Sequence, residues 1–436
     1  MPKSRLETDV RWSSPITLAS LTLRLREAGA GANDLQEVLE SRDRELVAAL
    51  CGPTYRPRAD GPRRAGTSRR TFGTLLGRIT VRVTLVRLPD GRIVTPLWQD
   101  VLISPRRLYQ DDVVAAAISG VQRMSYRNTL EELHRLTGIA PSPRTLNRRV
   151  VEHGLELQRH LRTRRLQAHA GVPDGTRLRN QTKGHHELRI TITENHRAPP
   201  QLRYIAVGER WDAHRDLLET KTRFVGATGE SGPPRITLDG EPGLMENLSF
   251  RGVHHQDCHI HVSRLMTHAM WRDGHRKRTP ESLAVRRQVT NLLRHLRNTV
   301  NAHANDPARI RLRIDETKRE LTDLIADLRE GGNHTTANSL TYMQDTLTVH
   351  AELAIKGYWM PWNTNRIERV MLEVSKRCKH RGMRWTTHGG TALVALLVYR
   401  FLEPNAYNQW WNTHLHGPTL KPRHGIDIQV TASGQT

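Results

Sequence analysis

Cysteine is scarce in this chain of 436 residues, and long apolar runs are missing. The three cysteines, Cys51, Cys258 and Cys378, form no Cys-x-x-Cys pair, so we expect no disulfide framework and a reducing, cytoplasmic setting. The N-terminus lacks the apolar stretch of a signal peptide. The longest apolar run, residues 391–399, is too short to span a bilayer, so no membrane partner is expected.

Acidic residues are in deficit. Lysine and arginine number 67 against 44 aspartate and glutamate residues, which gives a formal net charge of +23 and a sequence pI near 10.9. Such an excess predicts a polyanionic partner, and nucleic acid is the first candidate because neutralised phosphates release counterions. We therefore expect a protein associated with the nucleoid. Its length is enough for two or three domains with a sizeable core.

Three patterns divide the first 109 residues. Leucine and valine recur at helical spacing up to residue 50, so residues 1–50 are expected to form a helical region. Residues 51–70 alternate proline and glycine with arginine, which predicts a mobile basic linker that is either a DNA-backbone strap or a solvated loop. Residues 71–109 alternate apolar and polar positions around Pro89-Asp90-Gly91, the pattern of a β-hairpin region.

Residues 110–164 return to helical periodicity and are expected to bind DNA. One helix ends at a turn that contains Gly138, and a second begins with Ser142 as its N-cap and Pro143 at the first helical position. This order is similar to a helix-turn-helix, and a plain helical hairpin is the alternative. The candidate DNA contacts on the second helix are Arg144, Asn147, Arg148 and Arg149.

The rest of the chain predicts an α/β fold. Residues 165–272 give three antiparallel strands, a helix and a further strand, an order compatible with a sheet of the ribonuclease-H type; residues 188–193 alternate like a half-buried strand. Residues 273–355 are helical and predict a bundle inserted before residues 356–402, which complete the sheet region. Residues 403–436 form the C-terminal tail, polar and loose from His416.

Two aspartates and one glutamate are the candidate catalytic residues and metal ligands. Asp174 and Asp239 each follow a short apolar run and precede a glycine, which lets a backbone or a phosphate approach closely. Glu368 lies in the first turns of an amphipathic helix that Asn363 and Thr364 are expected to cap. Three such carboxylates would bind Mg²⁺, with Mn²⁺ as a substitute, in a site that activates a hydroxyl group. Taken alone, each Asp-Gly pair is also an ordinary turn signal.

A basic run follows Glu368 and is expected to contact DNA. It comprises Lys376, Arg377, Lys379, His380, Arg381 and Arg384. Trp362 and Trp385 flank this helix. They could stack on an unpaired base, and packing in the core is the alternative.

These residues carry a resemblance to a known family. The chain resembles the DDE transposases of prokaryotic insertion sequences, near the mutator-like group. The matching features are Asp174-Gly175-Thr176, Asp239-Gly240-Glu241, Cys258-His259-Ile260-His261, Asn363-Thr364-Asn365-Arg366-Ile367-Glu368 and a final block from Lys379 to Gly389. The resemblance covers roughly residues 110–402 and implies an RNase H-like catalytic core with an all-helical insertion.

The resemblance also implies an activity and partners. A DDE transposase binds the terminal inverted repeats of its element, cleaves a strand in a metal-dependent reaction and joins the 3′-hydroxyl to target double-stranded DNA. It implies a homodimer or higher oligomer on DNA, because two ends must be brought together. The residues with implied supporting roles are Cys258, His261, Asn365, Arg366 and Trp385.

Pro173 leaves the choice of acids open. Proline cannot donate in a central ladder, so Asp174 must lie at or just past the end of its strand, or the first acid is misassigned. The substitutes for the three acids are Asp212 or Asp216, Glu241 and Glu373.

Two further alternatives concern metal and function. Cys258 and His261, with three more histidines beside them, also suggest zinc, although the sequence offers no second cluster at a suitable spacing. A catalytically inactive DNA-binding protein and a structure-selective nuclease are the alternative functions.

Overall fold

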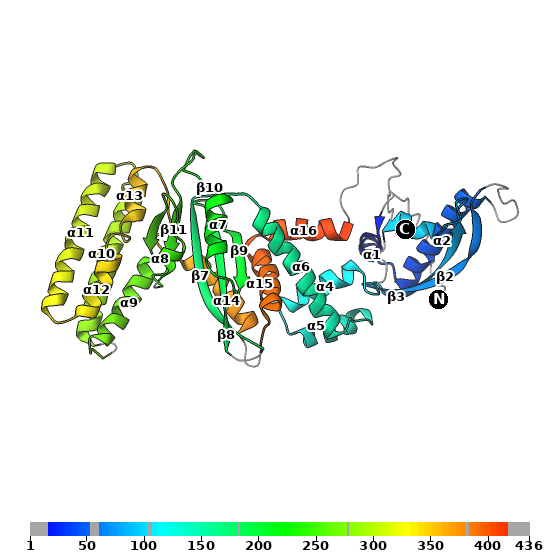
Figure 1. The fold of residues 1–436 in the computed structure, drawn as a ribbon, viewed down its shortest axis with the longest axis horizontal. Helices are drawn as coiled ribbons and strands as arrows, with labels where there is room; N and C mark the ends of the chain where they lie inside the picture. The colour runs from blue at the N-terminus through cyan, green and yellow to red at the C-terminus, as the bar shows by residue number, and fades with distance from the viewer. Residues whose placement is uncertain are drawn as a thin grey trace, which may run out of the picture. The chain divides into compact units, whose positions relative to one another are not determined.

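The computed structural model describes residues 16–52, 61–102, 107–181, 184–241, 243–276, 279–379 and 383–416 (Figure 1). Helices and several separate sheets are present, so the expected α/β class is confirmed. The chain divides into two compact units. We call residues 1–150 with 405–436 the first unit, and residues 151–404 the second unit.

The first unit combines a long two-stranded ribbon with helices. Its helices are α1 (Leu18–Glu27), α2 (Ala32–Cys51), α3 (Pro96–Asp100), α4 (Asp111–Val121), α5 (Tyr126–Thr137), the start of α6 (Pro143–Thr163) and α16 (Pro404–His416). Its strands are β1 (Ile16–Thr17), β2 (Arg63–Thr74), β3 (Gly77–Arg87), β4 (Ile93–Val94) and β5 (Val101–Leu102). β2 and β3 pair antiparallel along their whole length, and β4 adds a short third strand.

One face of the β2–β3 ribbon lies in the core of the first unit. Phe72, Ile79 and Val81 are buried on this face, and they share a hydrophobic cluster with Leu35 and Leu39 of α2. Packing of this apolar face against α2 stabilises the ribbon, because two strands alone are marginally stable in water. The hairpin expected from the alternation after residue 71 is present.

The basic stretch 51–70 is not a linker throughout, which corrects the sequence analysis. α2 extends to Cys51, and β2 begins at Arg63 and pairs with β3, while residues 53–60 lie outside the described part. The first half of β2 is exposed at every position and has no apolar alternation, so periodicity could not reveal the strand. These residues take the strand conformation because they pair with β3.

α5 and α6 form the helical pair expected within residues 110–164. Gly138 has a φ of 71° and ends α5 in the left-handed conformation that glycine adopts without strain. The Ser142 hydroxyl accepts a hydrogen bond from the Thr145 N–H at 3.2 Å, so the expected N-cap is present. α6 continues to Thr163, beyond the division between the units at Val150.

The C-terminal tail begins with helix α16. Tyr407 and Trp411 are buried, and the Gln122 side chain donates to the Tyr407 hydroxyl at 2.7 Å. Residues 404–416 are therefore part of the folded structure, and the segment from residue 417 lies outside the described part.

The second unit contains a five-stranded sheet and a helical bundle. Its strands are β6 (Leu166–Ala168), β7 (Ala170–Arg179), β8 (His185–Glu194), β9 (Gln201–Val207), β10 (Thr222–Phe224), β11 (Arg235–Leu238) and β12 (His254–Asp257). Its helices are α7 (Asp212–Thr220), α8 (Leu244–Asn247), α9 (His259–Arg272), α10 (Pro280–Ala302), α11 (Pro307–Glu330), α12 (His334–Met343), α13 (Val349–Ile355), α14 (Asn365–Cys378) and α15 (Thr387–Leu402).

The main sheet has the strand order β12-β11-β7-β8-β9. β7, β8 and β9 pair antiparallel, whereas β11 runs parallel to both β7 and β12. Helices cover both faces: Leu217 of α7 packs with Tyr204 and Ala206 of β9, and α15 contacts β9 from the side of Val207. Alternate residues of a strand point to opposite faces, so the two helices lie on opposite sides of the sheet.

The strand at 188–193 is buried more fully than the half-buried pattern predicted. Ile190 and Ile192 are buried, but so are Thr191 and Thr193 on the other face. The alternation of polar residues suggested a solvated face, yet α7 covers it: the Thr191 hydroxyl lies 2.7 Å from Nδ1 of the buried His214. Threonine fits there because its hydroxyl finds a partner.

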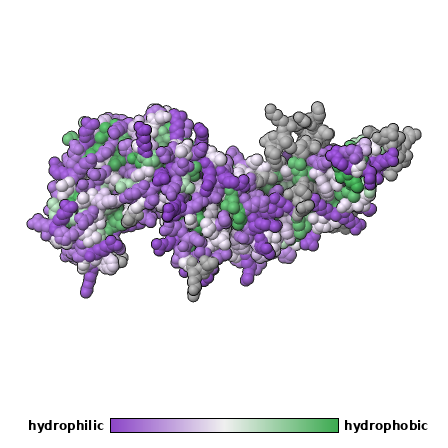
Figure 2. All heavy atoms as spheres, viewed as in Figure 1, coloured by the Kyte–Doolittle hydropathy of each residue, from purple (hydrophilic) through white to green (hydrophobic). Residues whose placement is uncertain are grey.

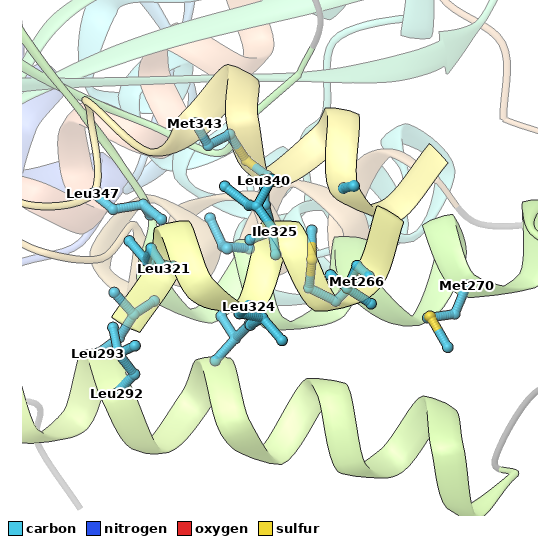
Figure 3. Close-up of a cluster of buried hydrophobic side chains, with 14 residues drawn as sticks. Met266, Met270, Leu292, Leu293, Leu321, Leu324, Ile325, Leu340, Met343 and Leu347 are labelled. Carbon is cyan, nitrogen blue, oxygen red and sulfur yellow. The ribbon is translucent and has the colours of Figure 1, made fainter. Parts of the chain in front are cut away.

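The helical segment expected at 273–355 forms a bundle with a continuous apolar core (Figure 3). α10, α11 and α12 contribute buried leucine, isoleucine and methionine side chains. α9, which sequence analysis assigned to the sheet region, also contributes Met266 and Met270. One helix thus links the bundle to the sheet.

Leu321→Ala is expected to lower the free energy of unfolding by about 3 kcal/mol, because it leaves a cavity in this core. Leu321 is fully buried on α11. Leu312→Ala on the same helix is the control, since Leu312 is 65% exposed. Urea unfolding measures both variants, and an equal effect of the two substitutions would contradict the assignment of the core.

Hydrophilic residues dominate the visible face of both units (Figure 2). Among the described residues, no helix has the length and apolar character needed to cross a membrane.

Candidate active site

The candidate site lies at the point where the parallel strands β11 and β7 stop pairing. β11 pairs with β7 at Ile236 and Gly171 and ends at Leu238. Asp239 directly follows β11, and Asp174 lies three residues beyond the paired Gly171 on β7. The two aspartates, 65 positions apart in the sequence, are near enough for the charge of Asp239 to raise the pKa of Asp174.

Asp174 lies inside β7, which corrects the expectation that it follows the strand. Pro173 is opposite Thr191 and Asp174 is opposite Ile190 of β8. β7 pairs with β11 only at Gly171, so β7 beyond that point is paired through β8 alone. Proline is tolerated at a strand position whose N–H side is not paired, and the same gap leaves room around the Asp174 carboxylate.

The three acids interact electrostatically. Burial, followed by the charge of Asp239 and, more weakly, that of Glu368, raises the pKa of Asp174 to about 7. The Gly175 N–H donates to Asp174 Oδ1 at 2.6 Å and partly opposes this rise. A negative charge on Asp174 is therefore costly unless a cation accompanies it.

Glu368 is presented by α14. Ile367, Val370 and Val374 are buried along one side of this helix, as the apolar spacing predicted, and Glu368 is about one-third exposed at the edge. The expected cap is made by only one of the two residues: Asn363 Oδ1 accepts from the Asn365 N–H at 3.0 Å.

Thr364 has a different task, which sequence reasoning missed. It is buried, and its hydroxyl lies 3.4 Å from Cys258 Sγ, 3.3 Å from His261 Nδ1 and 3.5 Å from Glu368 Oε1. A single hydroxyl thus connects α14 with the start of α9. The only sequence signal was its place in the Asn-Thr-Asn segment before the helix.

Cys258 and His261 lie beside the acids, at the start of α9. The Cys258 N–H donates to the Leu238 carbonyl at 2.7 Å, which fixes α9 to the end of β11. His261 Nδ1 lies 3.7 Å from Glu368 Oε1. Hydrogen bonding to Cys258, together with the Asp239 and Glu368 carboxylates, raises the pKa of His261 and favours a positive charge there.

The chemistry of the donors fits a hard divalent cation. Asp174, Asp239 and Glu368 offer only oxygen atoms, which Mg²⁺ prefers. Within the described ranges, no three His, Cys, Asp or Glu side chains come together as a ready-made metal site. The three carboxylates therefore interact electrostatically, but their oxygen atoms do not converge on one metal position. The described residues also provide no set of zinc ligands.

The substitute acids are placed less favourably, with one exception. Asp212 pairs with Arg215 at 3.2 Å and Glu373 pairs with Lys376 at 2.6 Å. Glu241 is the exception: its N–H donates to Asp239 Oδ1 at 3.0 Å, and burial, followed by the charge of Asp239, raises its pKa.

A small polar pocket of about 110 Å³ adjoins this edge of the sheet. Two arginines, Arg177 and Arg189, and two glutamates, Glu187 and Glu241, line it, and Arg189 forms an ion pair with Glu187. Lys379 reaches β7 and donates a hydrogen bond to the Thr176 hydroxyl. Positive side chains thus lie next to the carboxylates, where a phosphate would need them.

The expected DNA contacts after Glu368 divide into exposed and buried residues. Lys376, Lys379 and Arg384 are exposed, whereas Arg377 is buried 5.6 Å from the Trp385 ring. Trp385 is itself buried and donates from Nε1 to the Cys378 carbonyl at 2.9 Å. Arg377 and Trp385 are therefore packing residues. His380 and Arg381 lie outside the described residues.

The candidate contacts on α6 divide in the same way. Arg144, Asn147 and Arg148 are exposed, and Arg149 is 9% exposed. Leu146 and Val150 are buried on the same stretch of α6, and Arg149 lies beside Val150 on that packed side. Arg149 is therefore the one candidate on this helix that does not face solvent.

Arg366 ties α14 to the loop between β8 and β9. Its Nε lies 3.6 Å from Glu194 Oε2, and its Nη1 donates to the carbonyls of Asn195 at 3.5 Å and Ala198 at 3.4 Å. Asn365 is exposed at the first turn. Arg366 thus positions the helix that carries Glu368.

Glu194→Gln is expected to stabilise the protein above neutral pH. Burial raises the pKa of Glu194 to about 7, and Arg366 only partly opposes the rise. The folded state therefore holds the proton more tightly than the unfolded state, so wild-type stability falls as the pH rises from about 4.5 to about 7. The loss is on the order of 3 kcal/mol, and glutamine removes it.

Calorimetry near pH 5 and near pH 8 measures this effect. The matched control is Glu219→Gln, because Glu219 is exposed on α7. A wild-type stability that rises between the two pH values, with no gain from Glu194→Gln, would contradict the assignment.

Comparison of the chain with protein-family models and with curated proteins finds no match in either case.

Proposed function

We propose that this protein is a DNA transposase of an insertion sequence, which uses three carboxylates to cleave and join DNA strands with the help of Mg²⁺. One observation carries the proposal. Asp174, Asp239 and Glu368 come from distant points of the sequence to one edge of a sheet, and the charges of Asp239 and Glu368 raise the pKa of Asp174. A buried carboxylate whose pKa is raised by neighbouring carboxylates in this way is typical of a divalent-cation site.

The topology supports an RNase H-like core. Three antiparallel strands are followed by a helix and by two strands parallel to the first, with the first strand in the centre of the sheet. The first acid is on the central strand, the second follows its parallel neighbour, and the third is on a helix that contacts the central strand. The helical bundle lies between the second and third acids in the sequence.

In this proposal each side chain has a defined task. Asp174, Asp239 and Glu368 would hold the divalent ions, which supply the Lewis acidity for phosphoryl transfer when bound. Thr364 and His261 orient Glu368, and Lys379 with Arg177 binds the phosphates on either side of the cleaved bond. A water oxygen attacks the phosphorus and gives up a proton, while the bond to the 3′-oxygen breaks and that oxygen takes up a proton. The released 3′-hydroxyl then loses its proton as it attacks a phosphorus of the target strand, where the bond to the target's own 3′-oxygen breaks and this leaving oxygen is protonated.

The exposed residues of α6 support a second contact with double-stranded DNA, at the terminal repeats. Arg144, Asn147 and Arg148 supply phosphate and base-edge donors there. Because two ends must be joined to one target, the DNA-bound form would be a homodimer or a higher oligomer.

Incubation of the full chain with Mg²⁺ and an end-labelled duplex tests the function. The duplex carries the DNA that borders the gene, because the repeats of an element lie there. We expect nicked strands and joined products that EDTA prevents. Binding without any product would assign the chain to inactive DNA-binding proteins, and nicking without joining would assign it to nucleases.

A further inference from the structure

The β2–β3 ribbon has a second face that the active-site proposal does not use. Residues opposite each other in antiparallel strands point to the same face. Three successive pairs share this face: Thr67 with Thr84, Arg69 with Arg82, and Thr71 with Thr80. We call these six residues the Arg–Thr ladder. The other face of the ribbon is buried in the core of the first unit.

Backbone hydrogen bonds show that the side chains of the ladder lie close together. The N–H groups of Arg82 and Thr84 donate to Glu40 Oε1 at 3.0 Å and to Asp43 Oδ2 at 2.9 Å, so they point away from β2. Residues with N–H groups so directed belong to non-hydrogen-bonded pairs, in which opposite side chains approach more closely. The hydroxyls of Thr71 and Thr80 lie 3.0 Å apart, in agreement.

Arg69 and Arg82 are therefore two like charges held side by side, and both are exposed. Like charges directly opposite each other destabilise a strand pair. In the part of the chain that the structure describes, neither arginine forms an ion pair with a carboxylate. The nearby Glu40 accepts from the Arg82 N–H, and Asp43 accepts from the Thr84 N–H and from the Thr84 hydroxyl. Arg78 adds a third exposed charge to the same face. A polyanionic partner converts this repulsion into attraction.

We propose that the Arg–Thr ladder inserts into the major groove of double-stranded DNA. The groove of B-DNA is about 12 Å wide and admits a two-stranded ribbon whose strands are about 4.8 Å apart. An antiparallel strand rises about 3.4 Å per residue, which equals the rise per base pair, so successive pairs of the ladder meet positions about two base pairs apart.

The side chains of the ladder suit this partner. Arginine donates in pairs to guanine O6 and N7 or to phosphate oxygens, and the threonine methyl contacts the thymine methyl. The inference specifies the DNA-binding part of the proposed function, and it does not depend on strand cleavage.

The test is a binding titration of the full chain with Arg69 and Arg82 both replaced by glutamine. We expect at least about 10-fold weaker binding to a duplex, since two cationic contacts are lost. If both arginines contact phosphates, the slope of log affinity against log salt concentration falls by about 1.8. The matched control is Arg24→Gln with Arg26→Gln, which removes the same charge from exposed positions on α1.

Three outcomes overturn the inference: unchanged affinity of R69Q/R82Q, an equal loss in R24Q/R26Q, or equal competition by double-stranded RNA. The last follows because the A-form major groove is too deep and narrow for a ribbon. Failure of the proposed enzymatic function gives a different pattern, in which R69Q/R82Q loses DNA binding but the wild type yields no cleaved product.

Discussion

Asparagine in place of Asp239 is expected to abolish Mg²⁺-dependent strand cleavage, with a loss of at least about 10³-fold, while duplex binding is retained. Asparagine keeps the size of the side chain but removes the negative charge that would hold the cation. The same loss is expected for Asp174→Asn and Glu368→Gln, because the three carboxylates share one electrostatic environment. A gel assay with a labelled duplex measures cleavage, and a shift assay on the same duplex measures binding.

These variants have a built-in check on folding. Burial and the neighbouring acids raise the pKa of Asp174, so its negative charge destabilises the metal-free fold, and Asp174→Asn is expected to unfold at no lower temperature than the wild type. Asp212→Asn is the matched control, because Asp212 is 59% exposed and paired with Arg215 on α7. Undiminished cleavage by all three variants would refute the assignment, as would an equal loss in Asp212→Asn.

The local structure around Asp239 and Glu368 could be predicted from sequence because it depends on nearby residues. Asp239 follows an apolar run and precedes a glycine, the signal of a strand end, and Glu368 lies on a helix whose apolar spacing is regular. The position of Pro173 inside β7 could not be predicted, because it depends on where β11 stops pairing with β7. Thr364 was missed for the same reason, since its partners come from α9, about a hundred residues earlier.

The fold shows the same division between local and tertiary effects. The helices of residues 280–355 follow from a period of 3.6 residues, which is written in the sequence itself. The strand β2 does not follow from sequence periodicity, since its first half has no apolar face. It is a strand because it pairs with β3. Burial of Arg149 and Arg377 was equally hidden, because an arginine in a basic run has the same local signature whether it faces solvent or a ring.

Arg203→Met is expected to lower the free energy of unfolding by about 5 kcal/mol. Arg203 is fully buried in β9, and its guanidinium donates to the carbonyls of Leu161, of Arg164 at 2.7 Å and of Lys221 at 3.5 Å. Burial lowers its pKa to about 10, so the side chain remains charged at neutral pH. Methionine fills much of the space but removes the donor to the Leu161 and Arg164 carbonyls, whereas the Lys221 carbonyl still accepts from the Leu166 N–H at 3.0 Å.

The size of this effect comes from the end of α6. The last carbonyls of a helix have no partner within it and carry partial negative charge, and Leu161 belongs to this last turn. One guanidinium binds the Leu161 carbonyl of this turn and the Arg164 carbonyl just after the helix at once, because its donors form a planar fork. Arg203→Lys keeps the charge but not the fork, so we expect it to recover only part of the stability. Arg223→Met, at an exposed position of β10, should change it by no more than about 0.5 kcal/mol. Calorimetry measures the free energy of unfolding of each variant. Equal losses in Arg203→Met and Arg223→Met would show that the buried guanidinium does not stabilise the end of α6.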